Sequence, residues 1–275
     1  MSGKTLRLKR FIAPHDGRVI IFPLDHGVSC GPESAPRDMD ETIRMGIRAG
    51  TDALVLHKGM MRFLHSVGDR LPGIFMHVSA STQLGPSIHR KVLVGTVEEA
   101  IRRGADGISV HVNLGDTYEP EMLRDLGIVG NACAEWQIPL LVMIYIRGVH
   151  APSPLPDASV EYAARVAAEL GADIIKIPSP QDSALLAKIA RTLPVPVVIA
   201  GGTKSPDVHL FLERIAGAMQ AGVRGVAVGR NVFQDERPES LFRAIRRVVH
   251  ESFSAAMAWD EYRSLSSPSG IPEAT

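Results

Sequence analysis

Short apolar runs recur along the whole chain, and each is continuous rather than alternating with polar residues. Continuous apolar runs bounded by turn residues are typical of parallel strands whose outer face is covered by helices. The pattern therefore predicts eight buried strands. These strands are expected at residues 19–24, 52–57, 73–78, 106–111, 139–145, 172–177, 196–200 and 225–229.

Helical patterns separate several of these runs. The segments 96–104, 157–171 and 205–222 each begin at a residue that can cap a helix and end at a glycine. Thr96 and Ser205 are two of the expected caps, and a proline follows the second of them in the first turn. Each segment is thus predicted to be a helix that lies between two strands.

A faint repeat supports an alternation of helices and strands. The stretches AGTDALVLH, RGADGISVH, LGADIIKIP and AGVRGVAVG each place a glycine and a short link before a buried strand. Eight alternating units favour a (β/α)8 TIM barrel, with a doubly wound open sheet as the alternative. We expect a single α/β domain over residues 1–264 with a short N-terminal extension, followed by a flexible polar tail at 265–275.

Composition and charge exclude several classes of protein. The chain has 30 Lys and Arg against 30 Asp and Glu, with no long run of one sign, so it lacks the basic stripe of a nucleic-acid binder. No apolar run reaches the length of a membrane span, and the N-terminus has no apolar core like that of a signal peptide. Cys30 and Cys133 form neither a disulfide framework nor a CxxC motif. We expect a cytoplasmic protein that binds neither nucleic acid nor membrane.

Polar residues gather at the ends of the predicted strands. In a (β/α)8 barrel the active site lies at the carboxyl ends of the strands, so these residues are expected to share one site. They are Asp25, His26, His57, Lys58, His77, Ser79, His111, Asn113, Tyr145, Arg147 and Lys176.

Lys176 is unusual because it lies inside the apolar stretch ADIIKI. One explanation is a lysine whose stem packs while its ammonium reaches water. The other is a nucleophile, because apolar neighbours lower the pKa of a lysine and the free amine can attack a carbonyl to form an iminium. The acid and base groups at neighbouring strand ends favour the nucleophile.

Tyr145 and Asp25 are the candidate proton-transfer groups. Tyr145 ends the strand before that of Lys176, so both side chains can reach one substrate, and Asp25 follows the first strand. A tyrosine that merely lines the barrel and a carboxylate that caps a loop are the structural alternatives. His26 is expected to point to the opposite side from Asp25 and is not proposed as catalytic.

Glycine turns follow the last two strands. Gly201 and Gly202 occur in AGGTKS, and Gly229 and Arg230 occur in VAVGRN. Backbone N–H groups at such turns, helped by helix N-termini and by the arginine, can bind a phosphate at this place in a barrel. Glycines needed only for tight packing are the alternative.

Three histidines leave a different chemistry open. His57, His77 and His111 end consecutive strands and, with Asp25, could hold a metal ion. No HxH or HxxxH pair occurs in these strands, so neither a metal nor another cofactor is expected. A metal-dependent lyase or isomerase and a non-catalytic sensor of sugar phosphates are the alternative functions.

Several motifs together resemble the DhnA-type class I aldolases over roughly residues 15–250. They are PLDHG, VLHKG, HVSASTQLGP, VGTVEEAIRRGADGISVHVNLG, PLLVMIYIRG, GADIIKI, VVIAGG and GVAVGRNVFQ. The resemblance implies a (β/α)8 barrel that uses no metal and that assembles into rings of identical subunits, commonly decamers. The residues that match the family are Lys176 as Schiff-base lysine, Tyr145 as acid/base group, Asp25 as strand-1 carboxylate, and Gly201, Gly202, Gly229 and Arg230 as phosphate-binding turns.

The family includes archaeal-type fructose-bisphosphate aldolases and 2-amino-3,7-dideoxy-D-threo-hept-6-ulosonate synthases. The aldolases typically read WSYPRG around the tyrosine, whereas this chain reads MIYIRG, with Met143 in place of the tryptophan. HVSAST and HVNLG are more similar to the synthases and to their secondary-metabolism relatives, which act on the route to aminohydroxybenzoate. Ile146 departs from the family pattern, in which Pro or Ala precedes the arginine.

The resemblance therefore implies a Schiff-base aldolase with two small-molecule substrates. The donor would be dihydroxyacetone phosphate or a ketohexose phosphate, the acceptor L-aspartate 4-semialdehyde, and the product an amino-heptulosonate; fructose-bisphosphate aldolase is the alternative. Lys58 or Arg147 could bind the carboxylate of the acceptor, with a loop salt bridge as the ordinary role of each. Ser79 and His111 could bind substrate hydroxyl groups.

Overall fold

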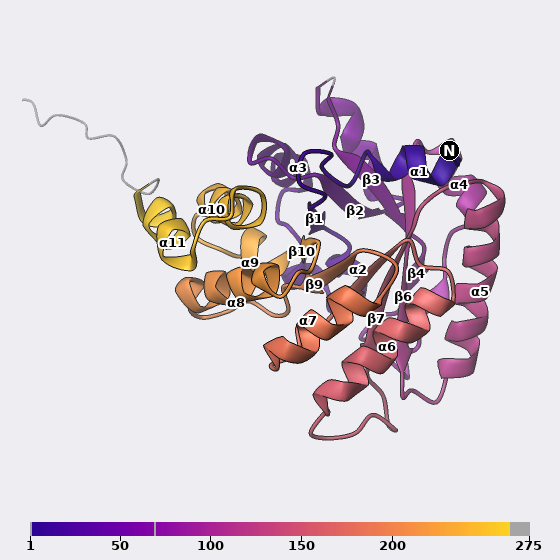
Figure 1. The fold of residues 1–275 in the computed structure, drawn as a ribbon. Helices are drawn as coiled ribbons and strands as arrows, with labels where there is room; N and C mark the ends of the chain where they lie inside the picture. The colour runs from indigo at the N-terminus through magenta and orange to yellow at the C-terminus, as the bar shows by residue number, and fades with distance from the viewer. Residues whose placement is uncertain (1, 69, 265–275) are drawn as a thin grey trace, which may run out of the picture.

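The computed structural model describes residues 2–68 and 70–264, and it contains a closed barrel of eight parallel strands (Figure 1). The barrel strands are β1 (Val19–Pro23), β2 (Ala53–His57), β3 (Gly73–His77), β6 (Gly107–Leu114), β7 (Leu140–Ile146), β8 (Ile174–Ile177), β9 (Val197–Ala200) and β10 (Gly225–Ala227). β1 pairs with both β2 and β10, which closes the barrel. The open-sheet alternative is therefore wrong, and the (β/α)8 prediction is confirmed.

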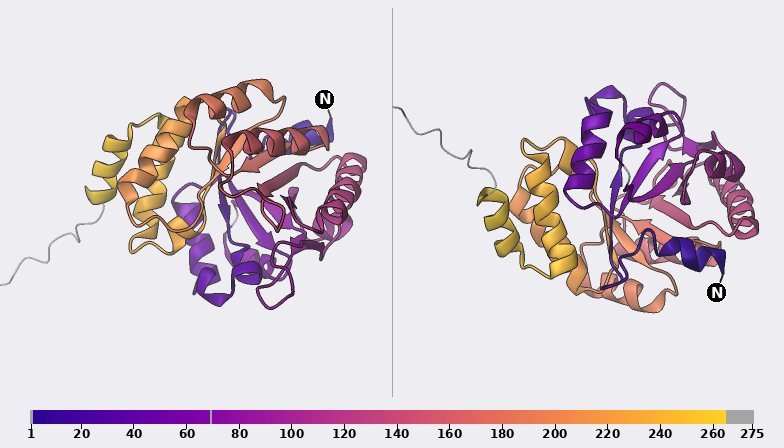
Figure 2. Two further views of the ribbon diagram at one scale, coloured as in Figure 1. Left: turned by 90° about the horizontal axis from the view of Figure 1, so that it is seen from below. Right: turned by 90° about the horizontal axis from the view of Figure 1, so that it is seen from above.

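Helices surround the barrel, as the two views in Figure 2 show. They are α1 (Gly3–Leu8), α2 (His26–Cys30), α3 (Met39–Arg48), α4 (Val97–Arg102), α5 (Glu119–Glu135), α6 (Asp157–Glu169), α7 (Ser183–Thr192), α8 (Val208–Gln220), α9 (Arg230–Phe233), α10 (Pro238–Glu251) and α11 (Ala255–Ser264), with the 3-10 helices η1 (Pro32–Ser34) and η2 (Met60–Ser66). In the described part of the chain, no helix has the length and hydrophobicity to cross a membrane. The tail predicted at 265–275 lies outside the described residues.

Side-chain caps at the starts of α4 and α8 can be compared with the predicted helix starts. Thr96 caps α4 by accepting a hydrogen bond from the N–H of Glu99 at 3.2 Å, as predicted. α8 begins later than predicted, because the carboxylate of Asp207, not Ser205, accepts the first N–H groups of the helix. Ser205 lies in the preceding loop, where its own N–H donates to the side chain of Asn231 at 2.8 Å. The segment after β9 is therefore a loop held by a side chain of a later helix.

The glycines of the repeat end helices as predicted. Their φ angles are +83° at Gly104, +97° at Gly171 and +92° at Gly222. Residues with a Cβ atom seldom adopt this left-handed conformation, so glycine both ends each helix and starts the link to the next strand.

Strand residues alternate between two packing environments. One set of side chains fills the barrel interior, and the other packs against the surrounding helices. On β8, Ile174 lies in the interior and Ile175 outside it, so the alternation directs Lys176 into the barrel. At the amino end, Phe11 stacks on Phe75 with ring centroids 3.9 Å apart and fills the interior. Lys176 therefore faces the opposite, carboxyl end.

The apolar pattern does not predict a small antiparallel ribbon that follows β3. In this ribbon β4 (Ser79–Ala80) pairs with β5 (Val92–Leu93). Two-residue strands are too short to carry a periodic signal. The ribbon brings His89 and Lys91, which lie on no barrel strand, to the carboxyl end of the barrel.

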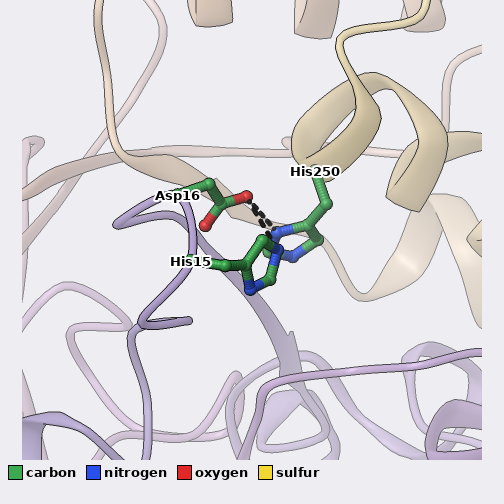
Figure 3. A group of neighbouring side chains, drawn as sticks. All are labelled: His15, Asp16 and His250. Atoms are coloured by element: carbon green, nitrogen blue, oxygen red, sulfur yellow. Dashed lines mark hydrogen bonds and ion pairs between the residues drawn. The ribbon is translucent and has the colours of Figure 1, made fainter.

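A histidine joins distant parts of the chain at the amino end of the barrel (Figure 3). The side chain of His250 of α10 is buried. Its Nδ1 lies 2.7 Å from a carboxylate oxygen of Asp16, and its Nε2 lies 2.9 Å from one of Asp52. His15 lies 3.4 Å from the same oxygen of Asp16. Burial lowers the pKa of His250, but the hydrogen bonds and charges of the two carboxylates outweigh burial and raise it. The protonated imidazole thus links α10 to the segments before β1 and β2.

Replacing His250 by asparagine is expected to lower the free energy of unfolding by roughly 3 kcal/mol at mildly acidic pH, because two carboxylates lose their buried cation. Since folding raises the pKa of His250, its contribution is complete below the unfolded pKa of 6.5 and is lost as pH rises through the higher folded value. The stability difference, measured by urea unfolding, should therefore shrink as the pH rises above the unfolded pKa. His209→Asn on α8 is the surface control, and a difference that does not vary with pH would contradict a charged His250.

Candidate active site

Two adjoining cavities open at the carboxyl ends of the strands. The larger has a volume of about 630 Å³ and the smaller a volume of about 130 Å³. The predicted nucleophile, Lys176, and the predicted acid/base group, Tyr145, line both of them. The residues that the two cavities share are His26, Tyr145, Arg147, Lys176 and Arg230.

Lys176 is buried at the junction of the cavities, with 6% of its surface exposed. Its Nζ lies 3.9 Å from Sδ of Met143 on the neighbouring strand β7. Among the described residues, no carboxylate oxygen lies within 4.0 Å of this nitrogen, so no ion pair holds it. A thioether is a weak acceptor, which leaves the amine able to meet a substrate carbonyl.

Asp25 follows β1 and lines the smaller cavity. Its carboxylate lies 3.8 Å from Nε2 of His77 and 3.7 Å from Nδ1 of His26. Burial raises the pKa of Asp25, but its basic neighbours lower it more, so the net pKa is well below its usual value. Those neighbours are, in order of effect, His77, His26, Lys176 and His57. The carboxyl group is therefore ionised at neutral pH and can stabilise a neighbouring positive charge.

The strand-end histidines are neutral hydrogen-bonding groups. Burial lowers the pKa of His77 to about 3, and it also lowers the pKa values of His57 and His111. Nδ1 of His77 bonds the hydroxyl of Ser109 at 2.7 Å. Nε2 of His111 bonds the side chain of Asn113 at 2.9 Å. These bonds hold both rings in place around the smaller cavity.

The metal hypothesis needs several ligand atoms close to one another. Among the described residues, the group of His, Cys, Asp or Glu atoms that lie within 4.8 Å of one another is formed by His15, Asp16 and His250, at the other end of the barrel. The strand-end histidines form no such group within the described part of the chain.

Tyr145 lies two residues beyond Met143 on β7, so it points into the barrel one layer above Lys176. Its ring is tilted against that of His111 at a centroid distance of 5.0 Å, and the guanidinium of Arg147 lies over it at 4.1 Å. These contacts fix the ring. Its hydroxyl bonds no residue that the structure describes, so it is free to face a ligand.

The two predicted glycine turns line the larger cavity and are tied to each other by Asn231. This buried side chain donates to the carbonyl oxygens of Gly201 and Thr203 at 2.9 and 3.0 Å. Its Oδ1 also accepts the N–H of Ser205. The loop after β9 is thus held in a fixed position relative to α9, which begins just beyond β10.

Close packing requires a glycine at position 229, which agrees with the alternative that the turn glycines serve tight packing. A Cβ atom there would lie 2.5 Å from the carbonyl oxygen of Pro23 and 2.8 Å from the ring of His26. Gly229 also lines the larger cavity, so packing and ligand contact are compatible. The expected contribution of a helix N-terminus is weaker after β9, because α8 starts farther along the chain and Asp207 already caps it.

Arg230 has a buried polar atom without a protein partner. Its Nε bonds no group in the described part of the chain. A buried N–H that lacks an acceptor is costly, so a ligand or water is expected to supply one. Because Arg230 lines both cavities, an anion in either could do so.

The prediction that His26 points away from Asp25 is wrong. β1 ends at Pro23 and α2 begins at His26, so the alternation of the strand does not extend to this residue. His26 instead lines both cavities beside Asp25. Burial lowers its pKa to about 4, so the ring is neutral near pH 7.

Two of the predicted binding residues lie away from the cavity surfaces. Lys58 comes directly after His57, the last residue of β2, and its side chain points away from the barrel interior. It forms an ion pair with Glu99 at 3.2 Å. Ser79 is buried, and its hydroxyl accepts a hydrogen bond from the backbone N–H of His111 at 2.8 Å. It therefore helps to position His111 and does not line a cavity. His111 and Arg147 do line the smaller cavity.

Lys91 is a cavity residue that cannot be found by looking for polar residues at the ends of the predicted strands. It lines the smaller cavity and is 7% exposed, but it precedes β5 of the ribbon rather than following a barrel strand. The signal available in the sequence is the short apolar run 92–94 directly after it, which is too short to distinguish from a loop.

A family model described as "DeoC/LacD family aldolase" matches residues 19–235. The chain belongs to the DeoC/LacD aldolase family. The match spans the barrel from β1 to the residues after α9, and so it includes every strand that lines the two cavities.

Two relatives of this aldolase are named synthases of seven-carbon amino acids. The 2-amino-4,5-dihydroxy-6-oxo-7-(phosphonooxy)heptanoate synthase of Streptomyces griseus is 38% identical over 250 residues, which cover 91% of this chain and 91% of that protein. The 2-amino-3,7-dideoxy-D-threo-hept-6-ulosonate synthase 1 of Archaeoglobus fulgidus is 37% identical over 91% of this chain and 92% of that protein.

Solved structures of archaeal fructose 1,6-bisphosphate aldolases share the fold of this aldolase. One of them, with its catalytic lysine covalently bound to the carbinolamine intermediate of the substrate, has a TM-score of 0.81 and 29% identity over 90% of this chain and 99% of that one. A Schiff-base-forming fructose-1,6-bisphosphate aldolase has a TM-score of 0.82 and 28% identity, over 90% and 100% of the two chains. The chain is an enzyme of the class I aldolase type, and the resemblance to DhnA-type aldolases is confirmed.

Proposed function

We propose that this aldolase joins a phosphorylated ketone to L-aspartate 4-semialdehyde and so forms an amino-heptulosonate of seven carbons. The observation that carries the proposal is the position of Lys176 in a wall shared by two cavities, one lined by glycine turns and the other by Asp25 and Lys91. A donor in the larger cavity and an acceptor in the smaller one would meet at this amine. The ring of identical subunits implied by the resemblance and the cytoplasmic location expected from the composition belong to the same proposal.

The name of the Streptomyces griseus enzyme gives the connectivity of its product: an amine on carbon 2, hydroxyls on carbons 4 and 5, a ketone on carbon 6 and a phosphate ester on carbon 7. Breaking the bond between carbons 4 and 5 leaves a four-carbon amino acid with a terminal aldehyde and a three-carbon ketone phosphate. These are aspartate 4-semialdehyde and dihydroxyacetone phosphate, whose atoms sum to the product with nothing left over. At 38% identity over the whole barrel, we propose the same pair here.

The phosphate of the donor is proposed to bind at the turns that contain Gly201, Gly202 and Gly229, with Arg230 as the cation. Support comes from the lining of the larger cavity and from the unpaired Nε of Arg230, which a phosphate oxygen would satisfy. Phosphate sites after the last two strands are a recurrent feature of (β/α)8 barrels.

Lys176 is proposed as the nucleophile. Lys91 is also a buried lysine of the smaller cavity, but Lys176 lines both cavities and can therefore reach a ketone whose phosphate lies on the glycine turns. Its amine would add to the ketone carbonyl to give a carbinolamine, which loses water to form an iminium. The positive iminium would lie near the ionised Asp25, whose negative charge stabilises it.

Tyr145 and Asp25 are proposed to move the protons. Removal of a proton from the carbon beside the iminium gives an enamine, and this carbon then bonds the aldehyde carbon of the acceptor. The aldehyde oxygen takes up a proton and becomes the hydroxyl on carbon 4. Water adds to the new iminium, the product ketone leaves, and the amine of Lys176 is restored. Tyr145, with its unbonded hydroxyl and fixed ring, is suited to give and take these protons.

The test is borohydride reduction of the enzyme with dihydroxyacetone phosphate, followed by intact-protein mass spectrometry and by product analysis with L-aspartate 4-semialdehyde. We expect one covalent donor fragment per chain and a seven-carbon amino-keto phosphate as product. A donor adduct with product formed only from glyceraldehyde 3-phosphate would instead indicate a fructose-bisphosphate aldolase, the activity named for the structural neighbours. No adduct with this ketone or with ketohexose phosphates would refute the proposal.

A further inference from the structure

Lys91 is a buried cation without a fixed counter-ion. Among the described residues, no carboxylate oxygen lies within 4.0 Å of its Nζ. The ammonium instead donates to two hydroxyl groups, those of Ser29 at 3.2 Å and Ser81. Burying an ammonium without a carboxylate in direct contact is costly, so this lysine is a candidate for binding an anion.

The ribbon of β4 and β5 positions Lys91 in the same cavity as Asp25 and Lys176. The backbone N–H of Lys91 points to Sδ of Met122 on α5 at 3.4 Å, and β5 begins with the next residue. Its side chain lines the smaller cavity, as do Asp25 and Lys176. Burial lowers the pKa of Lys91 and the positive charge of Arg147 lowers it further, although Cys30 and Asp25 act in the opposite direction. A bound carboxylate would also raise this pKa.

Lys91 and the glycine turns line different cavities, with Lys176 and Tyr145 in the wall between them. Two anionic groups carried by the two substrates would therefore lie on opposite sides of the new bond. The volume of the smaller cavity is about 130 Å³, roughly four times the ~30 Å³ that one water occupies in the liquid. This space suits a carboxylate on a short carbon chain.

We infer that Lys91, assisted by Ser29 and Ser81, binds the carboxylate of the acceptor aldehyde. The inference rests on the proposed function and adds the group that selects the acceptor. Lys91 thereby takes the role of carboxylate-binding cation that the sequence suggested for Lys58 or Arg147. Lys58 is paired with Glu99 outside the cavities, and Arg147 is exposed.

The experiment compares Lys91→Met with the natural enzyme on three aldehydes: L-aspartate 4-semialdehyde, succinate semialdehyde, which keeps the carboxylate but lacks the amine, and butanal, which lacks both. We expect kcat/KM to fall on the order of 30-fold or more for both carboxylates, mainly through KM, and to change less than about threefold for butanal. Borohydride trapping of dihydroxyacetone phosphate should be unchanged. Lys188→Met on the exposed face of α7 is the matched control.

The outcomes separate this inference from the proposed function. A donor adduct in both proteins, together with equal effects on charged and uncharged aldehydes, would overturn the inference alone. A loss confined to L-aspartate 4-semialdehyde would also overturn it, because the amine rather than the carboxylate would then be recognised. No adduct in the natural enzyme would overturn the proposed function, and this inference with it. Lys91→Gln is measured in the same way if the methionine variant fails to trap the donor.

Discussion

Replacing Lys176 by methionine is expected to lower turnover by on the order of 10⁵-fold or more and to abolish the covalent adduct with dihydroxyacetone phosphate after borohydride reduction. Without Nζ no iminium can form, and the enamine that attacks the acceptor cannot form either. Methionine is similar in length to the lysine stem and apolar, and its surroundings are the sulfur of Met143 and the barrel core, so the fold should be retained. Turnover and intact-protein mass are the two measurements.

Lys188→Met, on the exposed face of α7, serves as the control and should keep both activity and adduct. Lys91 is the rival nucleophile, because it is a second buried lysine of the smaller cavity. An adduct that persists in the Lys176→Met variant and disappears in Lys91→Met would move the Schiff base to Lys91. Peptide mapping of the reduced adduct in the natural enzyme would identify the residue directly.

Replacing Tyr145 by phenylalanine is expected to slow turnover by roughly 10²- to 10⁴-fold while donor affinity changes little. The substitution removes the hydroxyl but keeps the ring, which packs against His111 and under the guanidinium of Arg147. Since the phosphate turns lie on other strands, the dissociation constant of dihydroxyacetone phosphate, measured by calorimetry in the absence of acceptor, should stay within about threefold. The iminium should still form, though more slowly.

Tyr162→Phe is the matched control, because this tyrosine is exposed on α6, outside both cavities. It should leave turnover and affinity as they are. If Tyr145→Phe lowers turnover and donor affinity by the same factor, the tyrosine is a binding or structural residue, and the proton must come from another group. Asp25 and His26, which share its surroundings, would then be the next candidates.

The sequence predicts the barrel because strands buried on both faces appear as continuous apolar runs. The same rule underestimates the length of strands that carry site residues. β6 extends to Leu114, beyond the predicted end at 111, and remains paired with β7 up to Ile146. His111 and Asn113 face the cavity, so their polarity interrupts the run although the backbone continues as a strand. A polar functional residue thus resembles the end of a strand.

Predictions of which side chains reach the cavities agree with the structure where strand alternation applies and fail where it does not. Lys176 and Tyr145 lie on β8 and β7, so their positions at the cavity follow from the neighbours on each strand. His26 already belongs to a helix, and Lys91 belongs to the ribbon, so no periodic pattern in the sequence places either one. Their positions depend on tertiary contacts between segments that are distant along the chain.

The pairing of β1 with β10 has a consequence for the order in which the protein is made. β1 is the first barrel strand to leave the ribosome and β10 the last, and the His250 contact to Asp16 needs a residue that emerges later still. Throughout most of translation one edge of β1 therefore has no partner. An unpaired apolar edge invites contacts between chains, so the nascent polypeptide depends on protection until its final quarter has been synthesised.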